Sequence, residues 1–523
     1  MAKTTGLSVE RFTEHQAVQE CIRKLENKFG QGGKNLIISD VLDTDGHQYV
    51  DLVQKGGGVL AIALVGYTYI LEAMGIRFIR HAGTSAGAIN AALMAVIGSN
   101  PATGEELSLT GRTIKGNKKI AKSNLILKAI CELNFFDFVD GHPVARWLIR
   151  KFISHKDFTA KLASWITGGI FILIALPVID LFLFGLHHQL AWASRLLQFF
   201  FLLTGFAYVT ATILIFYFRF LLKRLKDSGF GINPGDYLYN WVEAQMKEHH
   251  VHTVSDLVSA ASTPVPDLYL RADHPEKTRG LQGDVTFIAS ELVTQNKIEF
   301  PKMWPLFARH IDQLQPAGFV RASMSIPLFF ESYFINNIPC DEPQVKKAWQ
   351  ALGTTEPPCI ARFVDGGILS NFPINIFYNP NVTIPRLPSI GIDLDDALAP
   401  EKVLDQPVNP NLEAKNQTGM VVDDTSTNAL NWSLGGYLLR MFNTIRFYYD
   451  KDFLIKNAFF KKGIGTIPLK GFGWLNFFLS DEDKIEMFVL GAKAAEKFLD
   501  AFDWEQYKQE RVVMKQELEA AKT

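Results

Sequence analysis

Five residues early in the chain have the pattern of a nucleophile turn. Gly83 and Gly87 flank Ser85 in the order G-x-S-x-G, between an expected short strand, Ile76 to Ala82, and an expected helix of small residues, Ala88 to Ile97. The small flanking residues permit a sharp turn that lifts the serine hydroxyl beside a helix N-terminus, where backbone N–H groups stabilise developing negative charge. A tight glycine-rich turn with a capping serine has the same pattern, so the nucleophile is a hypothesis.

The base that would activate Ser85 is not predicted to be a histidine. Serine hydrolases of the α/β-hydrolase order need an acidic residue and then a histidine downstream of the serine. The last histidine of this chain is His310, and none follows Asp365. His81 is expected on the strand that enters the turn, as a structural residue. The sequence therefore excludes the order Ser85, Asp365, His.

A carboxylate that acts directly as the base is the simplest remaining option. Asp365 is followed by Gly366 and Gly367 and ends an expected short strand, Ala361 to Val364. Ligand-facing residues gather at such strand ends in open α/β sheets. An ordinary Asp-Gly turn has the same sequence.

A third glycine cluster precedes both of these turns. Gly56, Gly57 and Gly58 follow an expected strand and open a helix that begins at Val59. The N–H groups of these four residues would approach the oxyanion of a tetrahedral intermediate. A phosphate-binding loop is poorly supported because both nucleotide-binding glycine fingerprints are absent. A tight turn is the remaining alternative.

In this order, the three clusters resemble the patatin-like phospholipase family. The resemblance extends to Val320–Pro327 and to Asp365–Pro373. It implies an α/β fold with a mainly parallel sheet flanked by helices, and a Ser85–Asp365 dyad with Gly56 to Gly58 at the oxyanion hole. It also implies hydrolysis of lipid acyl esters with no metal or other cofactor. Leu60 and Ala61 stand where the family commonly has a cation and a glycine.

Two apolar stretches interrupt the resemblance. Ile166–Leu186 carries one charge, Asp180, and Leu196–Phe218 carries none. Each has about 21–23 residues, enough to cross roughly 30 Å of hydrocarbon at about 1.5 Å per residue. The apolar side chains outweigh the insertion cost of one carboxylate, about 3 kcal/mol. We expect a hairpin that spans the membrane, with a pair of interfacial helices forming a lipid-entry flap as the alternative.

The distribution of cations predicts the orientation of this hairpin. The connector holds Arg195, whereas the two flanks hold nine cations: Arg146, Arg150, Lys151, Lys156, Lys161, Arg219, Lys223, Arg224 and Lys226. The positive-inside rule then places the catalytic domain on the cytoplasmic side. The four cysteines show no metal-type spacing, and with no signal peptide expected they indicate reduced thiols. The formal net charge of −1 gives no support for nucleic-acid binding.

The expected organisation has five parts. They are a polar N-terminal arm (1–47), the first half of the catalytic domain (48–160), the membrane hairpin (161–226), the second half (227–400) and a C-terminal helical extension (401–523). The expected function is a lipid acyl hydrolase of the phospholipase A or lysophospholipase type that meets its substrate at the bilayer. Two alternatives are an acyltransferase and a catalytically silent lipid-binding scaffold. The sequence predicts no oligomeric state.

Overall fold

A computed structural model describes most of the chain. The described residues are 7–97, 99–100, 105–107, 113–115, 121–143, 146, 158–186, 191–227, 229–271, 280–395, 441, 444, 448–469 and 471–520. The chain divides into two compact units. The first comprises Met1–Phe138, Gly235–Ile326 and Ser332–Thr523, and the second comprises Val139–Pro234 and Pro327–Glu331.

Five parallel strands form the centre of the main sheet in the first unit. In spatial order they are β15 (Ile464–Pro468), β14 (Ser389–Asp395), β2 (Gln48–Gln54), β3 (Ile76–Thr84) and β9 (Asp284–Glu291). All seven residues of β2 are buried, as expected for a parallel strand with both faces covered.

The other strands of the same sheet pair in antiparallel fashion. Beyond β9 lie β13 (Ala361–Asp365) and β12 (Tyr333–Ile335), and β10 (Asn296–Phe300) also pairs with β9. On the other side, β1 (Val41–Leu42) pairs with β2 and with β8 (Tyr269–Leu270). The expected α/β fold is confirmed, but only five of the ten strands in this sheet are parallel to their neighbours in the run from β15 to β9.

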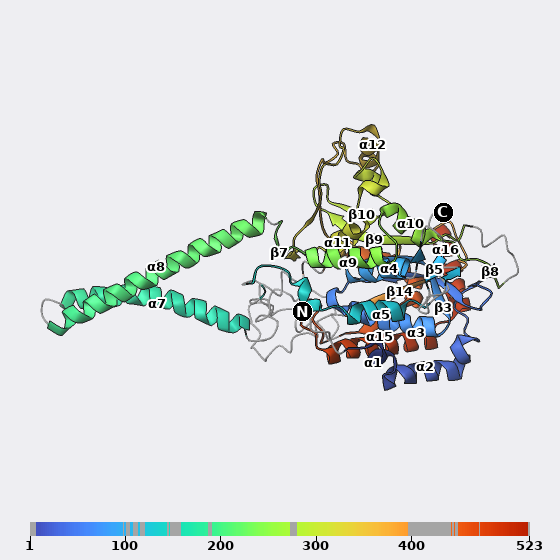
Figure 1. The fold of residues 1–523 in the computed structure, drawn as a ribbon, viewed down its shortest axis with the longest axis horizontal. Helices are drawn as coiled ribbons and strands as arrows, with labels where there is room; N and C mark the ends of the chain where they lie inside the picture. The colour runs from blue at the N-terminus through green and yellow to red at the C-terminus, as the bar shows by residue number, and fades with distance from the viewer. Residues whose placement is uncertain are drawn as a thin grey trace. The chain divides into compact units, whose positions relative to one another are not determined.

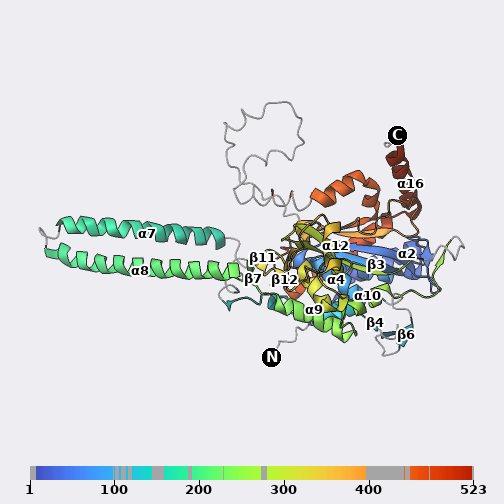
Figure 2. The same cartoon turned by 90° about the horizontal axis from the view of Figure 1, so that it is seen from above.

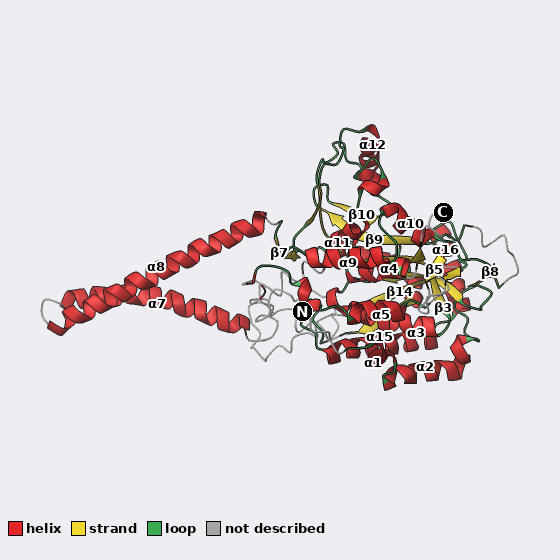
Figure 3. Ribbon diagram, in the orientation of Figure 1, coloured by secondary structure: helices red, strands yellow, loops and turns green. Residues whose placement is uncertain are grey.

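Helices cover both faces of this sheet (Figures 1 and 3). One face carries α3 (Ala61–Ala73) and α15 (Asp481–Ala501), and the other carries α4 (Ala86–Val96), α9 (Asp236–Glu248), α10 (Val254–Ser262) and α11 (Pro316–Ser323). α3 carries apolar residues on all sides because it lies between the sheet and α15. A helix in that position needs no polar face.

Two smaller elements follow α4. A separate three-stranded sheet consists of β4 (Ser99–Asn100), β5 (Glu105–Leu107) and β6 (Thr113–Lys115). α5 (Ser123–Cys131) then packs against α3. The buried carboxylate of Glu72 on α3 accepts hydrogen bonds from the N–H groups of Lys122 and Ser123 at 2.8 Å each, and so satisfies donors at the start of α5.

The residues expected to form a polar N-terminal arm include two helices that pack on the core. α1 (Val9–Thr13) and α2 (Gln16–Phe29) are separated at Glu14 and His15. Phe12 contacts Phe488 of α15 edge to face, with ring centroids 5.4 Å apart. Lys24 forms an ion pair with Glu496 at 3.2 Å.

The C-terminal residues are also more than a helical extension. They contribute β15, which pairs with β14, to the main sheet. They also form two helices, α15 and α16 (Trp504–Ala520), with a break at Phe502. Ser480 and Asp483 cap α15, and each side chain accepts a hydrogen bond from the other residue's N–H at 3.0 Å.

The second unit contains the apolar hairpin. α7 (Phe158–Leu186) and α8 (Ala191–Asp227) run side by side (Figures 1 and 2). The Thr204 hydroxyl of α8 donates to the Asp180 carboxylate of α7 at 2.6 Å, so the expected intramembrane charge faces the partner helix. Many apolar side chains of both helices are exposed on the surface of the hairpin. Two short parallel strands, β7 (Gly231–Asn233) and β11 (Leu328–Phe330), complete this unit.

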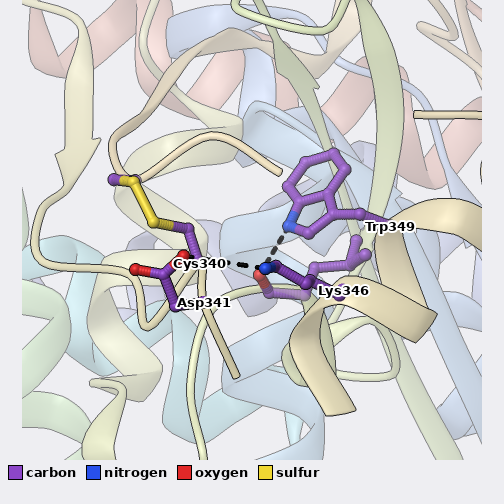
Figure 4. Close-up of a disulfide and its surroundings, with 6 residues drawn as sticks. Cys340, Asp341, Lys346 and Trp349 are labelled. Carbon is purple, nitrogen blue, oxygen red and sulfur yellow. Dashed lines mark hydrogen bonds and ion pairs between the residues drawn. A yellow bond between two sulfur atoms is a disulfide. The ribbon is translucent and has the colours of Figure 1, made fainter. Parts of the chain in front are cut away.

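One pair of cysteines contradicts the expectation of reduced thiols. Cys340 and Cys359 form a disulfide that closes the segment carrying α12 (Pro343–Ala351), as Figure 4 shows. Trp349 of α12 is fully buried and donates from its indole nitrogen to the Leu306 carbonyl at 2.8 Å. Cys21 and Cys131 are free and buried. The spacing of the two bonded cysteines, 19 residues apart, gave no sign of the pairing because an intervening helix brings them together.

Candidate active site

Ser85 lies at the expected turn between β3 and α4. Its backbone has φ 53° and ψ −121°, a conformation that side-chain-bearing residues rarely adopt. The flanking glycines are required by space. A Cβ on Gly83 would lie 2.2 Å from the Gly87 carbonyl carbon, and a Cβ on Gly87 would lie 2.3 Å from the Gln54 oxygen. The strand therefore turns into the helix with the serine held at its apex.

The C-terminal end of α11 contacts Ser85 directly. The Ser85 N–H donates to the Ser323 hydroxyl at 3.0 Å. The Ser85 hydroxyl donates to the sulfur of Met324, also at 3.0 Å. Both partners belong to the 320–327 segment that carried part of the family resemblance. Ser85 is only 3% exposed, so this segment covers the serine in the conformation described.

Asp365 ends β13 at a tight turn. Its Oδ1 accepts the Gly367 N–H at 2.7 Å, which caps the short 3₁₀ turn Gly366–Ile368. The Asp365 N–H donates to the Ser325 carbonyl at 2.8 Å. The Ser290 hydroxyl donates to the Asp365 carbonyl at 3.1 Å. These backbone contacts fix the position of a carboxylate that is 5% exposed.

Strand register brings Ser85 and Asp365 to the same level of the sheet. Thr84 pairs with Ile288 on one side of β9, and Asp365 pairs with Ala289 on the other side. The residue after Thr84 is Ser85, so both candidate catalytic residues flank β9 at Ala289. Two strand spacings of about 4.8 Å separate their backbones by about 10 Å.

The glycine loop lies beside the serine. A Cβ on Gly56 would lie 3.0 Å from the Ser85 Cβ. The Gly56 N–H donates to the Asn371 carbonyl at 3.0 Å, and the Val59 N–H donates to the Trp474 carbonyl at 3.1 Å. Among the described residues, the N–H groups of Gly57 and Gly58 donate to no carbonyl oxygen. Of the four expected oxyanion donors, the N–H groups of Gly56 and Val59 are thus already hydrogen-bonded within the protein.

A family model described as patatin-like phospholipase matches residues 52–378, more than half of the chain. The chain belongs to the patatin-like phospholipase family. The matched residues include the glycine loop, Ser85 and Asp365, which confirms the resemblance seen in the sequence.

Two further comparisons accompany this match. The uncharacterized protein YqhO of Bacillus subtilis is 34% identical over 161 residues, which cover 28% of this chain and 53% of that protein. The chain therefore spans about half the length of the curated relative that it matches. A crystal structure of VipD from Legionella pneumophila is 13% identical over 88% of this chain and 70% of that chain, with a TM-score of 0.30. A TM-score this low is not evidence of a shared fold.

The patatin-like site also contains a residue that the sequence did not suggest. The segment Ser370–Phe372 follows the Asp365 turn, and its Ser370 carbonyl accepts the Thr84 hydroxyl at 2.9 Å. Behind it, the Asp450 carboxylate accepts the Ser370 hydroxyl at 2.7 Å and the Phe372 N–H at 2.8 Å. Asp450 lies beyond the matched residues and in no motif, so no local signal pointed to it.

His81 and one acidic cluster outside this site have structural surroundings. His81 is buried in β3, with its ring 6.1 Å from that of Phe78. Asp43, Asp45 and His47 approach one another at the β1–β2 turn. Asp43 accepts the N–H groups of Asp45 and His47 at 2.9 and 3.0 Å and the Tyr49 hydroxyl at 2.8 Å. Its carboxylate thus holds a β-turn together, which accounts for the cluster without a metal.

Proposed function

We propose that this patatin-like protein hydrolyses carboxylic esters of membrane lipids, as a phospholipase A or lysophospholipase, through a Ser85–Asp365 dyad. The observation that supports this proposal most is the common level of the two residues on either side of β9. The strained serine backbone and the adjacent glycine loop supply the other parts that acyl transfer requires.

The mechanism has two steps. Asp365 takes the hydroxyl proton as Ser85 Oγ attacks the ester carbonyl, and the N–H groups of Gly57 and Gly58 receive the oxyanion. The C–O bond then breaks, and the leaving alcohol takes the proton from Asp365. Water attacks the acyl-enzyme, loses a proton to Asp365 and releases the fatty acid, which restores the Ser85 hydroxyl. No step needs a cofactor.

The substrate surface is proposed from the hairpin. Within α7 and α8, Ser164–Leu186 and Trp192–Lys226 are long and apolar enough to cross a membrane, with mean hydropathies of 2.5 and 2.1. Almost none of their apolar surface is buried in the protein: 11% and 0% of the residues in the respective windows. Exposure of so much apolar surface to water is energetically unfavourable, whereas its contact with lipid chains is favourable. We propose that the two helices span the bilayer and that both flanks lie on the cytoplasmic side.

The hydrolytic function is tested with the full chain in vesicles of a mixed-chain phosphatidylcholine. The wild type is expected to release fatty acid and lysophospholipid in equal amounts, and Ser85→Ala is expected to release neither. Ser259→Ala, an exposed serine on α10, is the matched control and should behave as the wild type. Acyl chains recovered on an added alcohol with no free fatty acid would instead establish an acyltransferase. Release of fatty acid from lysophosphatidylcholine alone would identify a lysophospholipase, and wild-type activity no higher than that of Ser85→Ala on either lipid would establish a silent scaffold.

The topology is tested separately by labelling single added cysteines in sealed vesicles. A cysteine at Gln189, in the connector, should react only from the lumenal side. A cysteine at Lys226, in the last turn of α8, should react only from the cytoplasmic side. Reaction of both from the same side would contradict the spanning hairpin and support an interfacial flap.

A further inference from the structure

Asp450 is a buried carboxylate that lies behind the candidate active site. Residues 448–456 are helical, and Asp450 is 6% exposed. Its two carboxylate oxygens accept separate donors. Oδ1 accepts the Ser370 hydroxyl at 2.7 Å, and Oδ2 accepts the Phe372 N–H at 2.8 Å. A buried carboxylate is costly unless it is hydrogen-bonded, so this pair of contacts holds the Ser370–Phe372 segment firmly.

The Ser370–Phe372 segment in turn contacts both halves of the site. The Ser370 carbonyl accepts the hydroxyl of Thr84, the residue before the nucleophile. Asn371 accepts the Gly56 N–H on its backbone carbonyl at 3.0 Å, and its side-chain amide donates to the Gly56 carbonyl at 3.2 Å. A single segment therefore sets the spacing between the nucleophile turn and the oxyanion loop.

We propose that Asp450 is a positioning residue for acyl transfer, which fixes Ser370–Phe372 and through this segment holds Gly56 and Thr84 at their working separation. The inference rests on the proposed lipid acyl hydrolase function. Asp450 touches neither substrate nor nucleophile in this arrangement. Its contribution falls on the transition state, where the oxyanion donors must lie within a few tenths of an ångström of their target, rather than on substrate binding.

The ionisation of Asp450 gives this role a pH dependence. Burial raises the pKa of the Asp450 carboxyl to about 6. Hydrogen bonds from Ser370, Phe372 and Asn371 and the nearby charge of Lys297 lower this pKa, but by less than burial raises it. On its own helix, the neighbours of Asp450 are Tyr449 and Lys451. The Lys297 ammonium lies 5.2 Å from the centroid of the Tyr449 ring. Because the folded-state pKa is raised, ionisation of Asp450 costs stability as the pH rises through about 6.

Catalysis responds to the pH in the opposite sense. The ionised carboxylate accepts on both oxygens, whereas the protonated acid must use one oxygen as a donor. The kcat for hydrolysis should therefore fall as the pH falls through about 6, with KM unchanged.

The first test compares Asp450→Ala with Asp43→Ala. Asp43 is also a fully buried, hydrogen-bonded carboxylate, but it lies at the β1–β2 turn outside the site. Both variants should lose stability. Asp450→Ala should lower kcat about 100-fold at constant KM, the scale of a small misplacement of catalytic groups. Asp43→Ala should leave the kcat of the folded fraction within about 2-fold of the wild type. Equal effects of the two variants on kcat would overturn the positioning role.

The second test uses Asp450→Asn, which keeps the shape of the side chain if the alanine variant does not fold. The amide cannot ionise, so the kcat profile should lose its step near pH 6. Its kcat at pH 8 should be about tenfold below that of the wild type. A step near pH 6 of undiminished size would overturn the role of Asp450 alone. A wild type no more active than Ser85→Ala would instead contradict the hydrolase function on which the role rests.

Discussion

The hydroxyl of Ser85 donates a hydrogen bond to the sulfur of Met324, with 3.0 Å between Oγ and Sδ. A thioether is a weak acceptor and cannot take a proton at neutral pH. The hydrogen bond therefore belongs to a resting arrangement, in which the Met324 side chain covers the Ser85 hydroxyl. In the proposed mechanism, the hydroxyl rotates from Met324 towards Asp365.

Met324→Leu should consequently preserve or raise the activity. Leucine has nearly the volume of methionine and costs less than about 1.5 kcal/mol in a packed site, but it offers the hydroxyl no acceptor. We expect kcat and the rate of Ser85 labelling by a fluorophosphonate to stay at or above the wild-type values. A loss of more than tenfold in both would mean that the sulfur takes part in the reaction.

The glycine loop offers two substitutions that keep the N–H donor but differ in fit. Gly58 has φ 56°, and an added Cβ would lie 2.1 Å from the Trp474 carbonyl oxygen. At Gly57 the added Cβ would meet only the end of the flexible Leu394 side chain, at 2.4 Å. Gly58→Ala should lower kcat by about 10²–10³, as loss of one oxyanion donor does. Gly57→Ala should lower it less than tenfold, and the opposite order would contradict the assignment of these donors.

The sequence predicted the parts of the site that depend on local geometry. The turn around Ser85 and the loop at Gly56 are recognisable because close backbone approach there demands glycine. Asp365 was selected by a rule about the ends of parallel strands, but β13 is antiparallel to β9. The residue reaches the site because the register of that pair places it beside Ala289. Strand direction depends on chain connections that a short motif does not contain.

Other features were unpredictable because they depend on long-range packing. β15 belongs to the region that the sequence assigned to a helical extension, but it pairs with β14 in the main sheet. Asp450 comes from the same region. Cys340 and Cys359 meet only because α12 folds between them. In each case the partner lies far away in sequence, and neither residue type nor spacing identifies it.

The disulfide can be tested by its effect on stability. In the chain-entropy account, a bridge across 19 residues contributes about 3 kcal/mol to the free energy of unfolding. Cys340→Ser with Cys359→Ser should lower that free energy by about this amount in urea unfolding, whereas Cys21→Ser and Cys131→Ser together leave the bridge intact.

Alkylation of the unfolded, unreduced protein checks the same point directly. Two reactive thiols, from Cys21 and Cys131, are expected. Four thiols in protein isolated without reductant would show that the bridge does not form in the cell, in agreement with a cytoplasmic catalytic unit.

The central claim is that Ser85 and Asp365 act as one unit. The most direct measurement is kcat for lipid ester hydrolysis by Ser85→Ala, Asp365→Asn and the double variant, each checked for folding. Asparagine keeps the size of Asp365 and can accept the Gly367 N–H on its amide oxygen, but it cannot take a proton. We predict that all three variants fall to the same background rate, because the effects of residues that act together do not add. A well-folded Asp365→Asn with near wild-type kcat, or a His81→Ala or His310→Ala variant as inactive as Ser85→Ala, would contradict the dyad.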